Sequence, residues 1–104
     1  MKQTPIRTEP PLLRQTPWGE ADRVQAVGTV NGHTIYLATT PSHGGYYVPD
    51  ALLDAIPDAH QRRAIQWSGS RHWYEEDCEY ASVVVAFPTL FSQAALTEAI
   101  KMIV

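Results

Sequence analysis

Four carboxylates stand close together in the second half of this 104-residue chain, at Glu75, Glu76, Asp77 and Glu79. Carboxylates grouped in this way can accept hydrogen bonds from arginine and lysine, or act as general acid and base. On a helix, Glu75 and Glu79 at i and i+4 share one face, from which Glu76 is displaced. The acidic block therefore indicates a surface for a basic partner. The candidate partner-binding residues are Glu75, Glu76, Glu79, Tyr74, Asp54 and Asp58.

A second candidate site is the segment Ser42-His43-Gly44-Gly45, where a histidine precedes two glycines. In one interpretation it is a structural turn that packs against the acidic block, with His43 bonded to Asp77 or Glu76. The glycine pair would then answer a need for positive φ or for close backbone approach. In the other, His43 and Asp77 or Glu76 serve a small metal-assisted hydrolase. We favour the structural turn, because adjacent Ser and His on a strand point to opposite faces.

The sequence gives no reason to expect a metal or another cofactor. His43, His72, Asp77 and Cys78 are metal-ligand types, but no two of them stand at CxxC or HExxH spacing. Cys78 is the sole cysteine, so it cannot form an internal disulfide. The acidic neighbours of Cys78 should raise its thiol pKa, which argues against a reactive thiolate.

The charge of the chain is unevenly distributed. The formal net charge is −3, yet residues 50–104 hold eight acidic residues against four basic ones. This bias argues against direct binding to nucleic-acid phosphates and favours a protein partner with a basic surface. No apolar run is long enough for a membrane span, and the first residues do not resemble a signal peptide. We therefore expect a cytoplasmic protein, monomeric or weakly dimeric.

The first half of the chain predicts an extended arm followed by a small sheet. Four prolines in residues 1–17 favour extended backbone, which leaves residues 18–104 as one α+β domain. Asn31-Gly32 between two runs of β-forming residues is typical of a type I′ hairpin turn. The predicted antiparallel strands are 24–30, 33–40 and 46–48.

The second half predicts helices that cover one face of this sheet, at about 50–56, 58–66, 73–87 and 92–103. The third helix is inferred from a stripe with steps of four and three residues, formed by Trp73, Asp77, Tyr80, Val84 and Phe87. A strand over 82–87 remains the alternative, because three consecutive valines favour β structure.

Tryptophan and tyrosine are abundant for this length. Most of them should lie in the core, and those that remain exposed would anchor an interface beside the acids. The residues concerned are Trp18, Trp67, Trp73, Tyr46, Tyr47, Tyr74 and Tyr80.

Three segments in this order resemble an uncharacterised bacterial domain family of plasmids, integrative elements and phage-derived proteins: TPWGEA at 16–21, SHGG at 42–45, and WYEEDCEYA at 73–81 leading to AFP at 86–88. The resemblance spans about residues 16–91. It implies a mobile-element setting, in which small acidic proteins often inhibit host defence, anti-CRISPR proteins among them. The expected function is then non-catalytic. Glu75, Glu76 and Glu79 would mimic nucleic-acid phosphates towards a basic surface on a host nucleic-acid-handling complex such as a CRISPR effector. The alternative is that these acids form only a solvated helix start.

Overall fold

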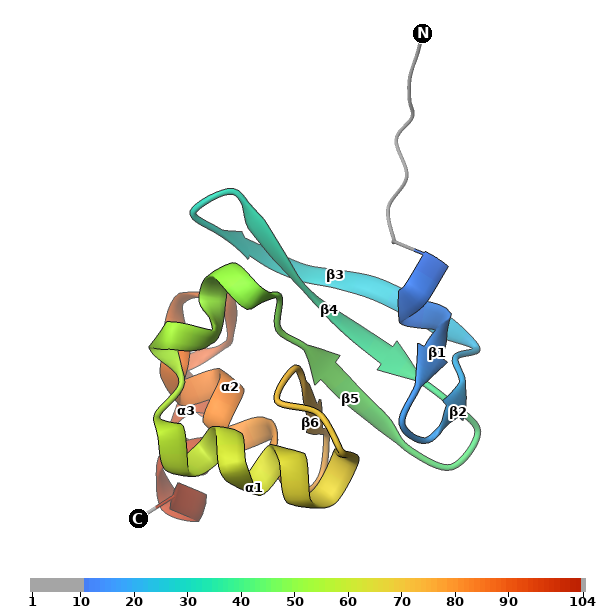
Figure 1. Cartoon of the computed structure of the whole chain (residues 1–104). Helices are drawn as coiled ribbons and strands as arrows, with labels where there is room; N and C mark the ends of the chain where they lie inside the picture. Colours follow the sequence, from blue (N-terminus) through green and yellow to red (C-terminus); the bar gives the residue numbers. More distant parts are fainter. Residues whose placement is uncertain (1–10, 104) are drawn as a thin grey trace, which may run out of the picture.

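The computed structural model describes residues 11–103 and has the predicted α+β architecture (Figure 1). Its centre is a four-stranded antiparallel sheet in the order β3-β4-β5-β6. The strands are β3 (Arg23–Val30), β4 (His33–Thr39), β5 (Gly44–Tyr47) and β6 (Trp73–Glu75).

The hairpin of β3 and β4 confirms the Asn-Gly prediction. Asn31 and Gly32 both have positive φ, at 50° and 82°, and Val30 pairs with His33 across the turn. A type I′ turn requires positive φ at both central residues, which asparagine and glycine tolerate best. A register shift between Ala26 and Gly28 marks a bulge in β3. Bulges of this kind increase the local twist of a strand pair.

Strand β5 begins two residues earlier than predicted, because both glycines of the SHGG segment belong to it. Neither glycine has a positive φ, so close packing is the reason for glycine at these positions. A Cβ at Gly45 would lie 2.4 Å from Cη2 of Trp18 and 3.0 Å from the carbonyl oxygen of Tyr74. A Cβ at Gly44 would lie 2.9 Å from Oε1 of Glu76.

The helix predicted over 73–87 is wrong in its first half. Trp73–Glu75 is strand β6, which pairs with Gly45–Tyr47, and the helix α2 (Tyr80–Ala86) begins only after an intervening turn. Backbone pairing with β5 satisfies the donors and acceptors of 73–75, and this long-range effect overrides the local helical pattern. The valine-rich run is helical, so the strand alternative for 82–87 is also wrong.

Residues 11–17, predicted as part of an extended arm, belong to the folded domain. They form a 3-10 helix η1 (Pro11–Arg14) and strand β1 (Gln15–Thr16), which pairs with β2 (Gly19–Glu20). Leu13 is buried, and the Trp18 ring meets Trp73 edge to face at a centroid distance of 5.9 Å. The remainder of the predicted arm, residues 1–10, lies outside the described residues.

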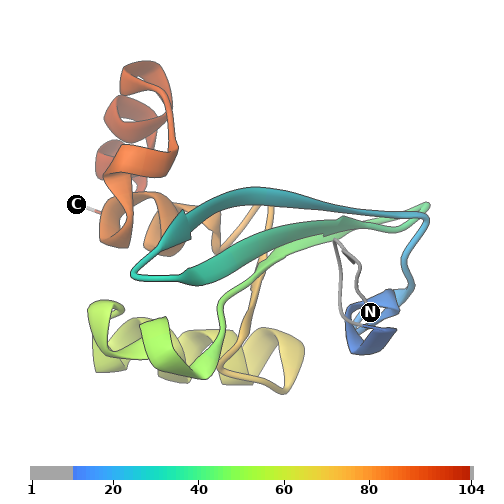
Figure 2. The ribbon, with the colours of Figure 1, turned by 90° about the horizontal axis from the view of Figure 1, so that it is seen from above.

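Three other helical segments lie close to their predicted bounds: the 3-10 helix η2 (Asp50–Ala55) and the α-helices α1 (Asp58–Ser68) and α3 (Gln93–Ile103). The 3-10 helix η3 (Pro88–Leu90) is not among the predicted helices. Oγ of Ser92 accepts a hydrogen bond from the backbone N–H of Ala95 at 3.1 Å, as expected for the N-cap of α3. The helices do not all cover one face as predicted, since Figure 2 shows α1 and α3 on opposite sides of the sheet.

The main core lies where the sheet meets α1 and α2. Its buried members come from β4, β6 and every helical segment between η2 and α2, and they include Ile35, Leu52, Ala64, Tyr74 and Val83. Within residues 11–103, no helix is both long and apolar enough to span a membrane.

Candidate functional site

The acidic block does not form the exposed helical surface that the sequence predicts. Glu75 is 8% exposed, Glu79 is 3% exposed, and Tyr74 is completely buried. All three were predicted to contact a partner, and all three are inside because 73–75 is a strand and Glu79 immediately precedes α2. Of the acids in the block, only Asp77 is exposed, while Glu76 is partly buried.

Glu75 organises the turn that joins β6 to α2. Its Oε1 accepts hydrogen bonds from the backbone N–H groups of Asp77 at 2.8 Å and Cys78 at 2.7 Å, and its Oε2 lies 3.3 Å from Nδ1 of His43. Burial alone would raise the pKa of Glu75, but these hydrogen bonds outweigh it and hold the pKa below its usual value. Glu75 is therefore a charged structural acceptor at neutral pH.

His43 is bonded to a carboxylate as predicted, but to Glu75 and not to Asp77 or Glu76. Its backbone is fixed by Thr40, whose Oγ1 accepts from the His43 N–H at 3.0 Å and donates to the His43 carbonyl at 2.7 Å. The His43 side chain remains 51% exposed. SHGG does pack against the acidic block, as the structural-turn interpretation predicts, but Gly44 and Gly45 belong to strand β5 and not to a turn.

Glu76 lies against the first glycine of the pair, Gly44. Its Oε1 would be 2.9 Å from a Cβ at Gly44, and its backbone N–H donates to the Gly44 carbonyl at 2.8 Å. Desolvation raises the pKa of Glu76, and the neighbouring charges of Asp77 and Glu75 raise it further. The turn thus holds three carboxylates close enough to repel one another.

Cys78 sits in the same turn and behaves as the sequence predicts. Its thiol is free, and desolvation together with Glu75 and the nearby acids raises its pKa. A thiol with a raised pKa is a poor nucleophile at neutral pH. Within the part of the chain that the structure describes, no three His, Cys, Asp or Glu side chains are grouped so that they could hold a metal ion.

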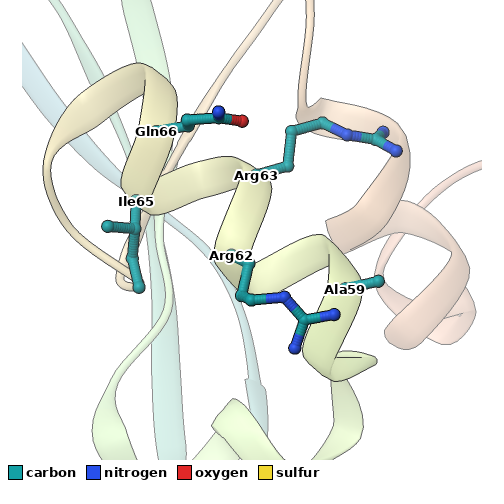
Figure 3. Close-up of a pocket in the computed structure, with 5 residues that line it drawn as sticks. All are labelled: Ala59, Arg62, Arg63, Ile65 and Gln66. Atoms are coloured by element: carbon teal, nitrogen blue, oxygen red, sulfur yellow. The ribbon is translucent and has the colours of Figure 1, made fainter.

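The two remaining candidate residues lie away from this turn. Asp54 is exposed on η2, and Asp58 at the start of α1 forms an ion pair with Arg62. Arg62 and Arg63 line an open hollow of about 520 Å³ along α1 (Figure 3). Arg63 points from α1 towards the C-terminal helices, where its charge reaches Glu79. This side of α1 is basic, so it does not extend the acidic surface.

A smaller cavity of about 320 Å³ opens beside the acidic turn. Four separate segments build it: the loop between β1 and β2, the connection from β4 to β5, the last turn of α1, and the end of β6 with the turn that follows it. The lining residues are Trp18, His43, Trp67, Glu75, Asp77 and Cys78. Its described lining contains two indoles and two carboxylates and no arginine or lysine, which is a suitable environment for a cation.

Neither tryptophan of this cavity, Trp18 or Trp67, was predicted as a site residue. Both belong to the seven aromatic side chains expected in the core or, where exposed, at an interface. Burial differs widely among these seven side chains: Trp73 is 7% exposed, whereas Trp67 is 66% exposed. Gly69, in the αL conformation, ends α1 and so places Trp67 in the last turn of that helix, but it does not mark the Trp67 side chain as exposed.

Glu79 is the buried acid that this arrangement does not use, and its replacement by glutamine should stabilise the fold. Its Oε1 has no hydrogen-bond partner in the part of the chain that the structure describes. Burial raises the pKa of Glu79, an effect that Arg63 opposes and Glu75 reinforces. The folded state therefore binds the Glu79 proton more tightly than the unfolded chain, so the penalty grows as pH rises through this raised pKa. At pH 7, Glu79→Gln should raise the free energy of unfolding by about 1 kcal/mol.

Urea denaturation of both proteins across pH would measure this effect. The extra stability of Glu79→Gln over the wild type should disappear as the pH drops below about 4, where the Glu79 carboxyl group is protonated in both the folded and the unfolded state. Glu98→Gln, on the exposed face of α3, is the matched control and should change little. A Glu79→Gln variant less stable than the wild type at pH 7 would contradict the prediction.

The comparisons with known proteins identify a family and no relative of known function. Residues 11–104 match the family described as a domain of unknown function, DUF7007. No curated protein and no solved structure gives a significant match to the chain.

Proposed function

Because the chain belongs to the DUF7007 family, a domain of unknown function, we propose its function from the site itself: non-catalytic binding of a protein that has a basic surface. The observation that carries the proposal is the cavity beside the acidic turn, where the charged side chains among the described lining residues are all acidic apart from His43. The exposed Asp77 and the partly exposed Glu76 stand at this turn and add to its negative potential. Such a potential attracts a basic partner and selects against acidic ones.

The site favours binding over catalysis because its buried carboxylate, Glu75, and the His43 ring are already engaged with structural partners. Oε1 of Glu75 accepts two backbone N–H groups, and its Oε2 is engaged by His43. A general base needs a lone pair free for the substrate proton. The alternative of a metal-assisted hydrolase at His43 with Asp77 or Glu76 loses the predicted pairing, since His43 bonds Glu75. A stoichiometric transition metal in the purified protein would nevertheless favour that alternative.

As its biological setting we propose a cytoplasmic, mobile-element-encoded inhibitor of a host nucleic-acid-handling complex, of the anti-CRISPR type. The acidic bias of residues 50–104 and the resemblance of the TPWGEA, SHGG and WYEEDCEYA segments support it. The predicted mimicry of nucleic-acid phosphates by Glu75, Glu76 and Glu79 does not fit the structure. Glu75 and Glu79 are buried, so the chain does not present a helical row of phosphate-like charges. The charges available to a partner are those of Glu76 and Asp77.

Affinity capture with a double variant tests the proposed function. The tagged wild type should capture a basic partner from a bacterial lysate rich in nucleoprotein complexes, and high salt should reduce the capture. Glu76→Gln with Asp77→Asn should weaken binding to that partner about tenfold, because two charges facing a basic surface are lost. The matched control is Asp54→Asn, an exposed acid on η2, which should bind as the wild type does. Equal capture by all three proteins would refute the proposal.

A further inference from the structure

We infer that the cavity between Trp18 and Trp67 receives a single arginine side chain of the partner. This inference rests on the proposed function and specifies its central contact. The cavity, at about 320 Å³, is near the lower limit of ligand sites and suits one side chain better than a large cofactor.

The first wall of the cavity is rigid. The Trp18 ring lies against Gly45, where even a Cβ would come within 2.4 Å of it. It also meets Trp73 edge to face, with an interplanar angle of 86°. The Trp18 backbone N–H donates to Oγ1 of Thr16 at 3.1 Å, which fixes the loop that carries it. Trp18 is thus held in place before any ligand arrives, which lowers the entropic cost of binding.

The second wall is exposed but well anchored. Trp67 is 66% exposed, the largest value among the exposed large apolar side chains of the described residues. It belongs to the last turn of α1, where Oγ of the neighbouring Ser68 donates to the Ala64 carbonyl at 2.8 Å and lies 3.2 Å from that of Trp73. Trp67 is thus an exposed tryptophan beside a cavity, and tryptophan is among the residue types enriched at interface hot spots.

The carboxylates select a positively charged ligand. Glu75 is held ionised by its backbone donors at the inner side of the cavity. The carboxylate of Asp77 has no hydrogen-bond partner among the described residues, so it can accept from a ligand. Glu75 supplies fixed negative charge, and Asp77 supplies the vacant acceptor.

Arginine fits these features better than lysine does. A planar guanidinium stacks on an indole face and keeps its edge donors free for a carboxylate, so one group can use both Trp67 and Asp77. The ammonium of lysine is more strongly hydrated and does not stack. Within residues 11–103, no arginine or lysine lines the cavity to repel such a ligand.

Titration of the full chain with three blocked tripeptides tests the inference. The probes are acetyl-Gly-Arg-Gly-amide, its lysine analogue, and its citrulline analogue, which keeps the planar shape without the charge. Binding is followed by two-dimensional NMR of the three indole N–H groups. The arginine peptide should shift the signals of Trp18 and Trp67, and the other two should bind about tenfold more weakly. Equal binding of lysine or citrulline would overturn the assignment to arginine.

The Trp67→Ala variant should bind the arginine peptide about tenfold more weakly, at unchanged stability because the side chain is exposed. The matched control is Ile65→Ala, another exposed position on α1 outside this cavity. If Trp67→Ala binds the peptide as the wild type does, the inference is wrong. If, in addition, Glu76→Gln with Asp77→Asn still weakens capture of the partner, the proposed function stands and only the arginine inference fails. If that double variant also captures the partner as the wild type does, both the inference and the proposed function are wrong.

Discussion

Replacement of Glu75 by alanine should lower the free energy of unfolding by about 3 kcal/mol, the largest effect expected of any acid in this chain. The reason is that its Oε1 satisfies two backbone donors of the turn, those of Asp77 and Cys78, which alanine leaves without an acceptor. Hydrogen bonds to an ionised group are the stronger kind, and loss of one partner leaves the other desolvated. Urea denaturation at pH 7 measures the loss.

The glutamine variant separates the charge of Glu75 from its shape. Glu75→Gln keeps an oxygen for the two N–H groups, so it should lose only about 1 kcal/mol at pH 7. The pKa of Glu75 is held below its usual value in the folded state, so its charge stabilises the fold above the unfolded-state pKa. That stabilisation should disappear as pH falls through the lowered pKa, where wild type and Glu75→Gln converge. An alanine variant as stable as the glutamine variant would contradict the structural role.

Local features account for the parts of the fold that the sequence predicted well. The hairpin depends on Asn31-Gly32, whose positive φ values are a property of two adjacent residues. The start of α3 depends on Ser92 and a backbone N–H three residues later. Both signals act within one turn of chain, so no knowledge of the rest of the molecule is needed.

The failed prediction at 73–79 depended on contacts that a local pattern does not contain. Trp73, Asp77 and Tyr80 are spaced as on a helix, but Trp73–Glu75 pairs with β5, which lies about 28 residues earlier in the chain. Once the first three residues are a strand, Glu75 turns its carboxylate back onto the following backbone. The hydrogen bonds from the backbone N–H groups of Asp77 and Cys78 thus hold the Glu75 carboxylate inside, although the sequence predicted Glu75 on the surface.

The candidate site was predictable in its chemistry but not in its arrangement. The sequence indicated acids, a histidine and aromatic side chains, and residues of all three types line the cavity. It placed His43 next to Asp77 or Glu76, whereas strand alternation brings the side chain of Glu75 to that position. Nothing in the sequence distinguishes the exposed Trp67 from the buried Trp73, because this difference arises from where α1 meets β6.

Gly45 connects the packing of the sheet to the shape of the cavity, and its replacement by alanine should lower the free energy of unfolding by about 2 kcal/mol. The added Cβ would lie 2.4 Å and 2.6 Å from two ring atoms of Trp18 and 3.0 Å from the backbone oxygen of Tyr74. Trp18 cannot easily retreat, since Trp73 is packed against its ring. The same displacement should weaken binding of the arginine peptide. Urea denaturation and the peptide titration measure the two effects.

A double-mutant cycle provides the control for Gly45→Ala. In a Trp18→Ala background the ring contact is absent, so the added methyl should cost about 1 kcal/mol less than in the wild type. The cost that remains reports the contact with the Tyr74 backbone, which neither substitution relieves. If Gly45→Ala costs the same in both backgrounds, Trp18 is not the obstacle. The rigid wall inferred for the cavity would then lose its basis, because a ring that gives way to a methyl group is not fixed in advance for a ligand.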